Sequence, residues 1–266
     1  MKLRRPALAG VALVALLLSA CAPPPRPGEL TSFATRYQSE RTRREQRLQS
    51  AELEMVVRLE GRATGRLPGL LVSGTIAGPD HLRLRAGWML GTALELVAIE
   101  DSVRVWLPTE HAVLEVGGLE QELHQPQPVA LMIRALSASW DPPASAWLEA
   151  TVDSTQVRLG WRQGADSLFM RVDGASRPLE LRIESGARGV SIHYAGWRKV
   201  NGVDWPTRME LTEREGWLRL RTELQALRSN RKLAEDSFIL RTPPDVKRLD
   251  WQQVRERLQA RGEGTP

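Results

Sequence analysis

The chain has 266 residues, a formal net charge of +5 at pH 7 and a single cysteine, Cys21. One cysteine excludes an internal disulfide framework. The basic balance reflects the use of arginine in place of lysine, and we do not interpret it as nucleic-acid binding. A chain of this length is sufficient for one large core, so we expect a single domain.

The first 20 residues are predicted to be a secretory signal. A positively charged start, at Lys2, Arg4 and Arg5, precedes an apolar stretch at 8–18 that is too short to span a bilayer comfortably. The segment ends in Leu18-Ser19-Ala20-Cys21, which resembles a bacterial lipoprotein signal. The resemblance implies that Cys21 is lipidated and begins the mature chain, and that Ala22 directs it to the outer membrane.

Residues 21–28 contain four prolines and are expected to form a stiff tether. The following stretch, Glu29–Ser50, is predicted to be a helix, because apolar residues recur at helical spacing in its first half. Its second half, Glu40–Arg47, is highly charged. This half is either a solvated helix face or a surface that contacts anionic headgroups next to a lipid anchor.

From Glu52 onward the alternation of apolar and polar residues predicts strands. The candidates before the middle of the chain are Glu52–Leu59, Leu70–Ala77, His81–Ala86, Ala93–Ile99, Ser102–Leu107 and Ala112–Val116. An apolar stretch with proline near its start, Pro126–Ser139, predicts a helix, which Asp141-Pro142-Pro143 ends.

Strands are predicted again in the second half of the chain. The candidates are Ala146–Val152, Gln156–Arg162, Ser167–Val172, Leu179–Glu184, Val190–Gly196, Asp204–Leu211, Trp217–Leu227 and Ser237–Leu240. The main domain is expected to span residues 29–242, followed by an extension at 243–266 with a polar helix at Trp251–Arg261. Consecutive strands with short turns indicate an antiparallel meander, and a sheet this long tends to curl or close. The apolar middle helix is expected inside the curl or across its mouth.

The hairpin formed by Leu82–Val97 has an unusual tip. Two alternating runs flank Trp88-Met89-Leu90, which is followed by Gly91. Hairpin turns lie at the surface and are usually polar, whereas this one carries three large apolar residues. The tip therefore either packs against a neighbouring element or contacts another apolar phase.

The sequence carries no catalytic constellation that we recognise. The histidines, His81, His111, His124 and His193, do not have metal-ligand spacing. Glu180 and Glu184 share a strand face, but Leu181 and its neighbours hold the opposite phase, so the glutamates are expected in solvent. We expect no enzyme activity, no metal and no cofactor.

Nine tryptophans are a large share for this chain. They either fill a core or line a concave sheet that suits acyl chains. A role of the tryptophans in stacking on single-stranded nucleic acid is less favoured, because we expect the chain to be exported. The candidate cavity-lining residues are Leu131, Met132, Leu136, Trp140 and Trp106.

Three parts of the chain resemble LolB-type outer-membrane lipoproteins. The run at 83–96, Arg-Leu-Arg-Ala-Gly-Trp-Met-Leu-Gly-Thr-Ala-Leu-Glu-Leu, is similar to the family's strand-loop-strand, roughly R-x-x-L-x-N-P-L-G-x-x-x-L-x-L, with Met89 in place of its proline. The helix at Pro126–Ser139 matches the helical cover after the sixth strand. Residues 192–211 are similar to a strand of the form Y-x-x-(W/Y) that leads to P-x-x-(M/I)-x-L.

The resemblance implies a mainly β, LolA/LolB-like fold: an incomplete antiparallel β-barrel with covering helices. LolB receives lipoproteins from the periplasmic carrier LolA and inserts them into the outer membrane. By position Leu90 is the residue that contacts the membrane, with Trp88 and Met89 as its support. The expected partners are the outer membrane, lipoprotein acyl chains or other lipids, and a LolA-like carrier. The alternative is an envelope lipoprotein that binds a protein partner through its basic helix and C-terminal extension.

Overall fold

The computed structural model describes residues 26–61, 65–88, 91–123, 127–153, 155–186, 188–215, 218–252 and 254. The predicted signal, most of the tether with Cys21, His124 and the tip residues Met89 and Leu90 lie outside these ranges. A short 3₁₀ turn, η1 (Pro27–Glu29), leads into α2 (Leu30–Arg47), which confirms the predicted N-terminal helix. Within the described ranges, no helix combines the length and apolar character that crossing a membrane requires.

Strands form most of the described chain. Before α4 they are β1 (Ser50–Gly61), β2 (Gly65–Arg66), β3 (Leu70–Ala77), β4 (His81–Trp88), β5 (Gly91–Ile99), β6 (Ser102–Leu107) and β7 (Ala112–Gly117). After it they are β8 (Thr151–Asp153), β9 (Gln156–Gln163), β10 (Asp166–Asp173), β11 (Pro178–Ser185), β12 (Arg188–Ala195), β13 (Arg198–Val200), β14 (Val203–Trp205), β15 (Arg208–Glu213), β16 (Leu218–Ser229) and β17 (Lys247–Leu249). The short helices are η2 (Pro108–Glu110), α3 (Leu119–Leu123), α4 (Pro128–Ser137) and α5 (Ala144–Leu148).

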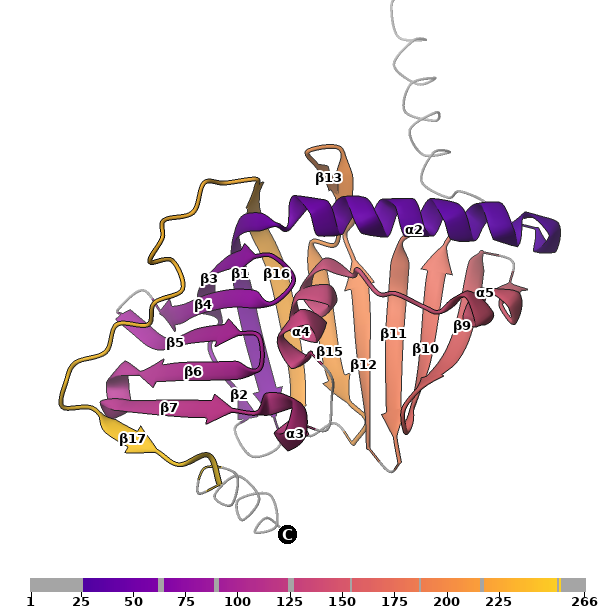
Figure 1. Ribbon diagram of the computed structural model, residues 1–266. Helices are drawn as coiled ribbons and strands as arrows, with labels where there is room; N and C mark the ends of the chain where they lie inside the picture. The colour runs from indigo at the N-terminus through magenta and orange to yellow at the C-terminus, as the bar shows by residue number, and fades with distance from the viewer. Residues whose placement is uncertain are drawn as a thin grey trace, which may run out of the picture.

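Fifteen of the described strands belong to one sheet, in the order β17-β7-β6-β5-β4-β3-β1-β16-β15-β12-β11-β10-β9-β8, with β2 beside β1. Strands β13 and β14 form a separate hairpin. The first and last long strands, β1 and β16, pair antiparallel at the centre, with Leu53 opposite Leu227 and Leu59 opposite Leu220. The sheet therefore consists of two meanders joined at β1–β16, and it curls without closing (Figure 1).

The helices occupy the curl and its upper edge. Figure 1 shows α2 along one end of the strands β9–β12 and β16, and α4 inside the curl. We call the face of the sheet that surrounds α4 the inner face; it carries Leu53, Ile76, Leu82, Met170 and Leu181, all buried. This arrangement confirms the predicted fold class and the predicted place of the middle helix.

Three strand predictions were wrong. The stretch Ala146–Val152 contains α5 and then β8, because Ala146 and Trp147 are buried side by side on a helix that starts after Pro143. The single strand Asp204–Leu211 is divided at Pro206, which has no amide hydrogen to donate to a strand neighbour. The stretch Ser237–Leu240 forms turns, and the strand in this region is β17.

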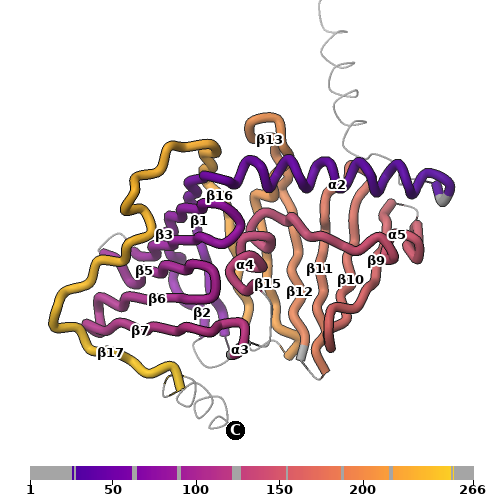
Figure 2. Tube along the Cα trace, in the orientation of Figure 1, coloured from indigo at the N-terminus to yellow at the C-terminus, as the bar shows by residue number. Residues whose placement is uncertain are grey.

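The C-terminal segment, residues 231–249, covers the outer face of β4–β7. Figure 2 shows the chain leaving β16, passing around this half of the sheet and returning to β7. Leu240 is buried against Val97 and Val113, and partly buried apolar side chains complete the cluster: Ile99, Trp106, Phe238 and Val246. Arg83 donates to the Ser237 carbonyl at 2.7 Å. Strand β17 then pairs with β7 in parallel, where the sequence had indicated no strand.

Candidate functional site

Helix α4 lies between the two large apolar clusters of the inner face. Pro128 occupies the first turn, where its missing amide hydrogen costs nothing, and Ala138 ends the helix in the left-handed conformation, with φ 52°. Val129 and Ile133 are buried in the cluster formed by β1 and β3–β5. Leu131 and Ala135 pack against the cluster formed by β9–β12. Because its residues join both clusters, α4 fills the interior of the curl.

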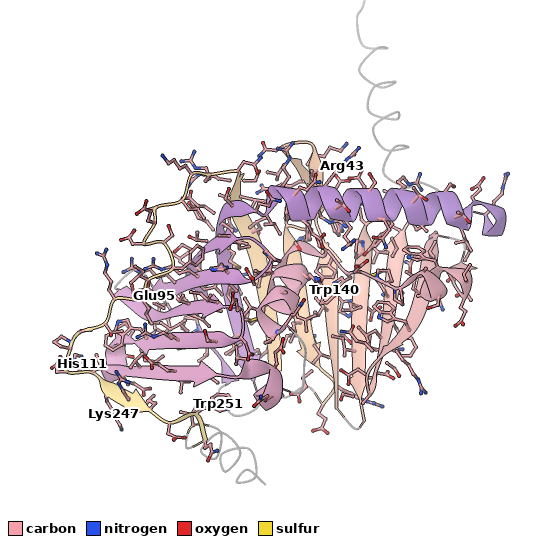
Figure 3. The ribbon with its side chains drawn as sticks, in the orientation of Figure 1. Arg43, Glu95, His111, Trp140, Lys247 and Trp251 are labelled. Carbon is pink, nitrogen blue, oxygen red and sulfur yellow. The ribbon has the colours of Figure 1, made fainter. Side chains whose placement is uncertain are left out.

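The predicted cavity-lining residues differ in their burial and in the face of the sheet on which they lie. Leu131 and Leu136 are half-buried, and Met132 is 37% exposed on the open side of α4. Trp140 is buried directly after α4, on the side of α2 that faces the sheet (Figure 3). Trp106 was wrongly assigned, because it lies with Val97 and Leu240 on the outer face, under the C-terminal segment.

The C-terminal end of α4 is held by a cluster that we call the α2–α4 cluster: Tyr37, Arg44, Ala138, Trp140 and Tyr194. Tyr37 donates from its hydroxyl to the Trp140 carbonyl at 2.8 Å. Trp140 donates from Nε1 to the Tyr194 hydroxyl at 2.9 Å, and that hydroxyl donates to the Ala135 carbonyl at 3.0 Å. These bonds connect α2, the end of α4 and β12, so α4 cannot leave the curl without breaking them.

Arg44 is the least satisfied member of the α2–α4 cluster. Its side chain is fully buried, and Nη2 donates to the Ala138 carbonyl at a long 3.4 Å. Nε and Nη1 have no acceptor within the described part of the chain, and the guanidinium lies 5.8 Å from the ring of Trp197. Burial lowers the pKa of Arg44 from its ordinary value. Each unsatisfied buried donor costs about 1–3 kcal/mol. Water admitted between α2 and α4 would satisfy these nitrogen atoms and so offset part of the free energy lost when the two helices separate.

The alkaline stability of the protein should report on the α2–α4 cluster, because Tyr37 and Tyr194 are the two tyrosines of the chain. Burial raises the pKa of both phenols above the ordinary value of 10.0. Above about pH 10 unfolded phenols ionise while the folded ones stay neutral, so each tyrosine should lower the unfolding free energy by about 1.4 kcal/mol per pH unit. Unfolding curves at increasing pH, followed with tyrosinate absorbance, measure this.

Tyr194→Phe should halve the slope of unfolding free energy against pH. Tyrosinate absorbance that rises near pH 10 in protein still folded by circular dichroism would contradict the buried positions of both phenols.

The inner face is only half covered at the end of the curl away from α2. Residues Leu59, Leu220 and Leu211 stand in one row across β1, β16 and β15. Val190, Ile183 and Trp161 lie on the inner face of the adjoining strands, and all six side chains are half-buried. These half-buried apolar side chains extend the inner face beyond its fully buried clusters at this end of the sheet.

The hairpin tip exposes apolar side chains in its described part. Trp88 is 45% exposed and Leu71, on the neighbouring strand, is 56% exposed. A groove of about 490 Å³ beside them is lined by both residues. The hairpin closes tightly at Gly87, which has no Cβ. A Cβ at this position would lie 2.3 Å from the Gly91 carbonyl oxygen. Trp88 and the neighbouring Leu71 therefore leave an exposed apolar surface beside the tip.

The polar candidates that lie within the described ranges do not converge on one site. Glu180 is paired with Arg171 and lies 3.6 Å from His193, and Glu184 is paired with Arg182. His81 contacts Asp80 and the ring of Phe238, and His111 lies 3.3 Å from Asp245. These side chains form ion pairs on the outer face or support the C-terminal segment.

These features define an open, curled antiparallel sheet with an apolar helix inside it. A LolA superfamily protein from Nitrosomonas europaea has a similar structure, with a TM-score of 0.53 at 10% identity over 76% of this chain and 97% of that one. A DUF1329 family protein from Desulfovibrio piger matches with a TM-score of 0.51 at 12% identity over 76% of this chain and 95% of that one. Neither a protein-family model nor a curated protein sequence matches the chain. The chain thus has the LolA-like fold, as its sequence had indicated.

Proposed function

We propose that this chain is a lipid-anchored protein of the periplasmic face of the outer membrane that binds acyl chains and assists insertion of the lipoproteins that carry them. The observation that carries the proposal is the position of α4. An apolar helix fills an open sheet, and its attachment to α2 contains a buried arginine, two of whose nitrogen atoms have no acceptor among the described residues. Displacement of α4 would offer both apolar clusters to a ligand.

The energetics of such a site are favourable for acyl chains. Removing apolar surface from water contributes about 25 cal/mol per Å², or about 0.8 kcal/mol for each methylene of an acyl chain. The same hydrophobic free energy must first be lost when Val129, Ile133 and Leu131 of α4 leave their clusters. The cargo therefore replaces α4 and does not enter an empty cavity. The proposal requires no covalent step and no cofactor.

In this proposal the hairpin tip meets the membrane. The exposed Trp88 and Leu71 support the assignment made from the sequence for Trp88, Met89 and Leu90. One buried leucine is worth about 1.5–3 kcal/mol, which is sufficient to orient the protein or perturb a leaflet but not to anchor it. Anchoring is the role of lipidated Cys21.

Leu90→Glu is expected to leave the fold intact and to abolish release of cargo into the membrane, because a carboxylate at the tip resists transfer into lipid. The measurement is transfer of a carrier-bound lipoprotein into liposomes by the purified protein. Leu148→Glu is the matched control: this leucine on α5 is 87% exposed and lies outside the tip. Transfer by Leu90→Glu at the rate of the control would exclude the tip from the mechanism.

A further inference from the structure

A polar pocket of about 380 Å³ lies at the C-terminal end of α2, beside the β13–β14 hairpin. Its walls come from α2, the β13–β14 hairpin and the residue after β16: Arg43, Gln46, Arg47, Asn201, Gly202, Val203 and Asn230. Figure 1 shows the hairpin projecting beside α2, and Figure 3 shows Arg43 on the side of α2 that points away from the sheet. The volume lies in the range that small ligands occupy, about 300–1,000 Å³.

The hairpin wall of the pocket is a tight turn that is hydrogen-bonded to the end of β16. Val200 pairs with Val203 across a two-residue turn, and both turn residues have positive φ, 51° at Asn201 and 81° at Gly202. This is the combination that asparagine and glycine adopt most readily in tight hairpins. Asn201 also donates from Nδ2 to the Ser229 hydroxyl at 2.7 Å, which fixes the turn against the end of β16.

The α2 wall supplies guanidinium groups that the fold does not use fully. Arg47 is half-buried, and within the described chain its guanidinium has no hydrogen-bond or ion-pair partner. Arg43 uses one nitrogen, Nη1, in an ion pair with Glu40 at 2.8 Å. The ion pair with Glu40 offsets the charge of Arg43, so the net charge on this wall is that of Arg47. One guanidinium charge exceeds the half unit of negative charge at a helix C-terminus, and the α2 wall therefore carries a net positive charge.

The charges around the pocket reinforce this sign. The nearest acidic residues of α2 are already paired, Glu40 with Arg43 and Glu45 with Arg41. Lys199 on the hairpin and Lys232 after β16 are exposed, whereas Asp204 on β14 is half-buried. An anion at the pocket therefore meets the two arginines of α2, and the acidic residues of α2 named here are already paired.

We propose that this pocket binds a phosphate group. Arg43, Arg47 and the amides of Gln46 and Asn230 offer more donors than the two oxygens of a carboxylate accept, whereas phosphate presents more acceptor oxygens, and arginine pairs with them bidentately. The phosphate belongs to either a phospholipid headgroup or a soluble phosphorylated compound. The polar lining residues of the pocket are not members of the α2–α4 cluster, and the proposal does not depend on acyl-chain binding.

The test uses the mature chain with Cys21→Ala, so that no lipid anchor contributes to binding. Binding of inorganic phosphate is measured by calorimetry, and binding to vesicles is measured by co-sedimentation, with phosphatidylcholine alone or mixed with phosphatidylglycerol. The variant is Arg43→Gln with Arg47→Gln. The control, Arg66→Gln with Arg162→Gln, removes the same charge at two exposed arginines outside the pocket.

The Cys21→Ala chain and its control variant are expected to bind phosphate. The pocket variant is expected to bind it at least about tenfold more weakly, because it loses the charge-assisted bonds of both guanidinium groups. A matching loss of binding to phosphatidylglycerol vesicles identifies the headgroup as the source, whereas loss for phosphate alone identifies a soluble compound. Equal phosphate binding by the pocket variant and the control, or no binding by the Cys21→Ala chain to either probe, overturns the proposal.

Discussion

Leu240→Asp is expected to lower the melting temperature of the protein by roughly 10 °C. Leu240 is 5% exposed and closes the apolar cluster between the C-terminal segment and the outer face of β5–β7. Loss of a buried leucine costs about 1.5–3 kcal/mol, and a carboxylate without a partner in that cluster costs more. A total of roughly 4 kcal/mol corresponds to roughly 10 °C for a chain of this size. Thermal unfolding followed by circular dichroism measures the shift.

Ile239→Asp supplies the control at the adjacent position. Ile239 is 55% exposed, so the same change of chemistry should shift the melting temperature by only a degree or two, since surface substitutions usually stay within about 0.5 kcal/mol. Equal shifts for the two variants would show that the C-terminal segment is not packed as part of the domain.

Linking α4 covalently to α2 is expected to abolish acyl-chain binding. Thr42 on α2 and Arg134 on α4 both line a groove of about 320 Å³ between the two helices. Cysteines at these positions, in the mature chain with Cys21→Ala, can be joined by a flexible bis-maleimide. With α4 held in the curl, its residues keep the apolar clusters closed to cargo. Binding of a triacylated lipopeptide should fall by at least about tenfold, the equivalent of about 1.4 kcal/mol.

Two controls isolate the effect of the link. The single-cysteine variants treated with the same reagent should bind like the untreated protein, because the reagent cannot join the helices. A reagent that contains a disulfide should give an inhibited protein whose binding returns on reduction. Full binding by the linked protein would show that cargo does not need the space that α4 occupies.

The sequence predicted most strands because each meander buries one face of each strand. Leu82, Ala86 and Ala98 alternate with outward residues and are buried as expected. The pairing of β1 with β16 was not predictable in the same way, because alternation shows which face is buried but does not identify a distant partner. The C-terminal segment was missed for a related reason: Phe238 and Leu240 pack through turns, where no period exists.

The candidate site was predictable only in outline. The apolar character of Pro126–Ser139 indicated an internal helix, and α4 is one. Trp106 was misplaced because composition does not distinguish the two faces of a strand when both are covered. Arg44 gave no signal at all, since in the sequence a buried arginine in a charged helix looks like its exposed neighbour Arg43 or its half-buried neighbour Arg47. Its role depends on Ala138 and Trp197, which tertiary packing brings to it.

Native mass spectrometry of the mature chain with Cys21→Ala determines whether the purified protein carries an acyl chain. The protein is purified from the periplasm without detergent and sprayed under conditions that retain noncovalent ligands. Acyl-chain binding predicts a population with the added mass of a lipid or acylated peptide, which disappears when α4 is linked to α2. A single unliganded mass that persists after incubation with a triacylated lipopeptide, together with one stoichiometric protein partner after crosslinking, would contradict it.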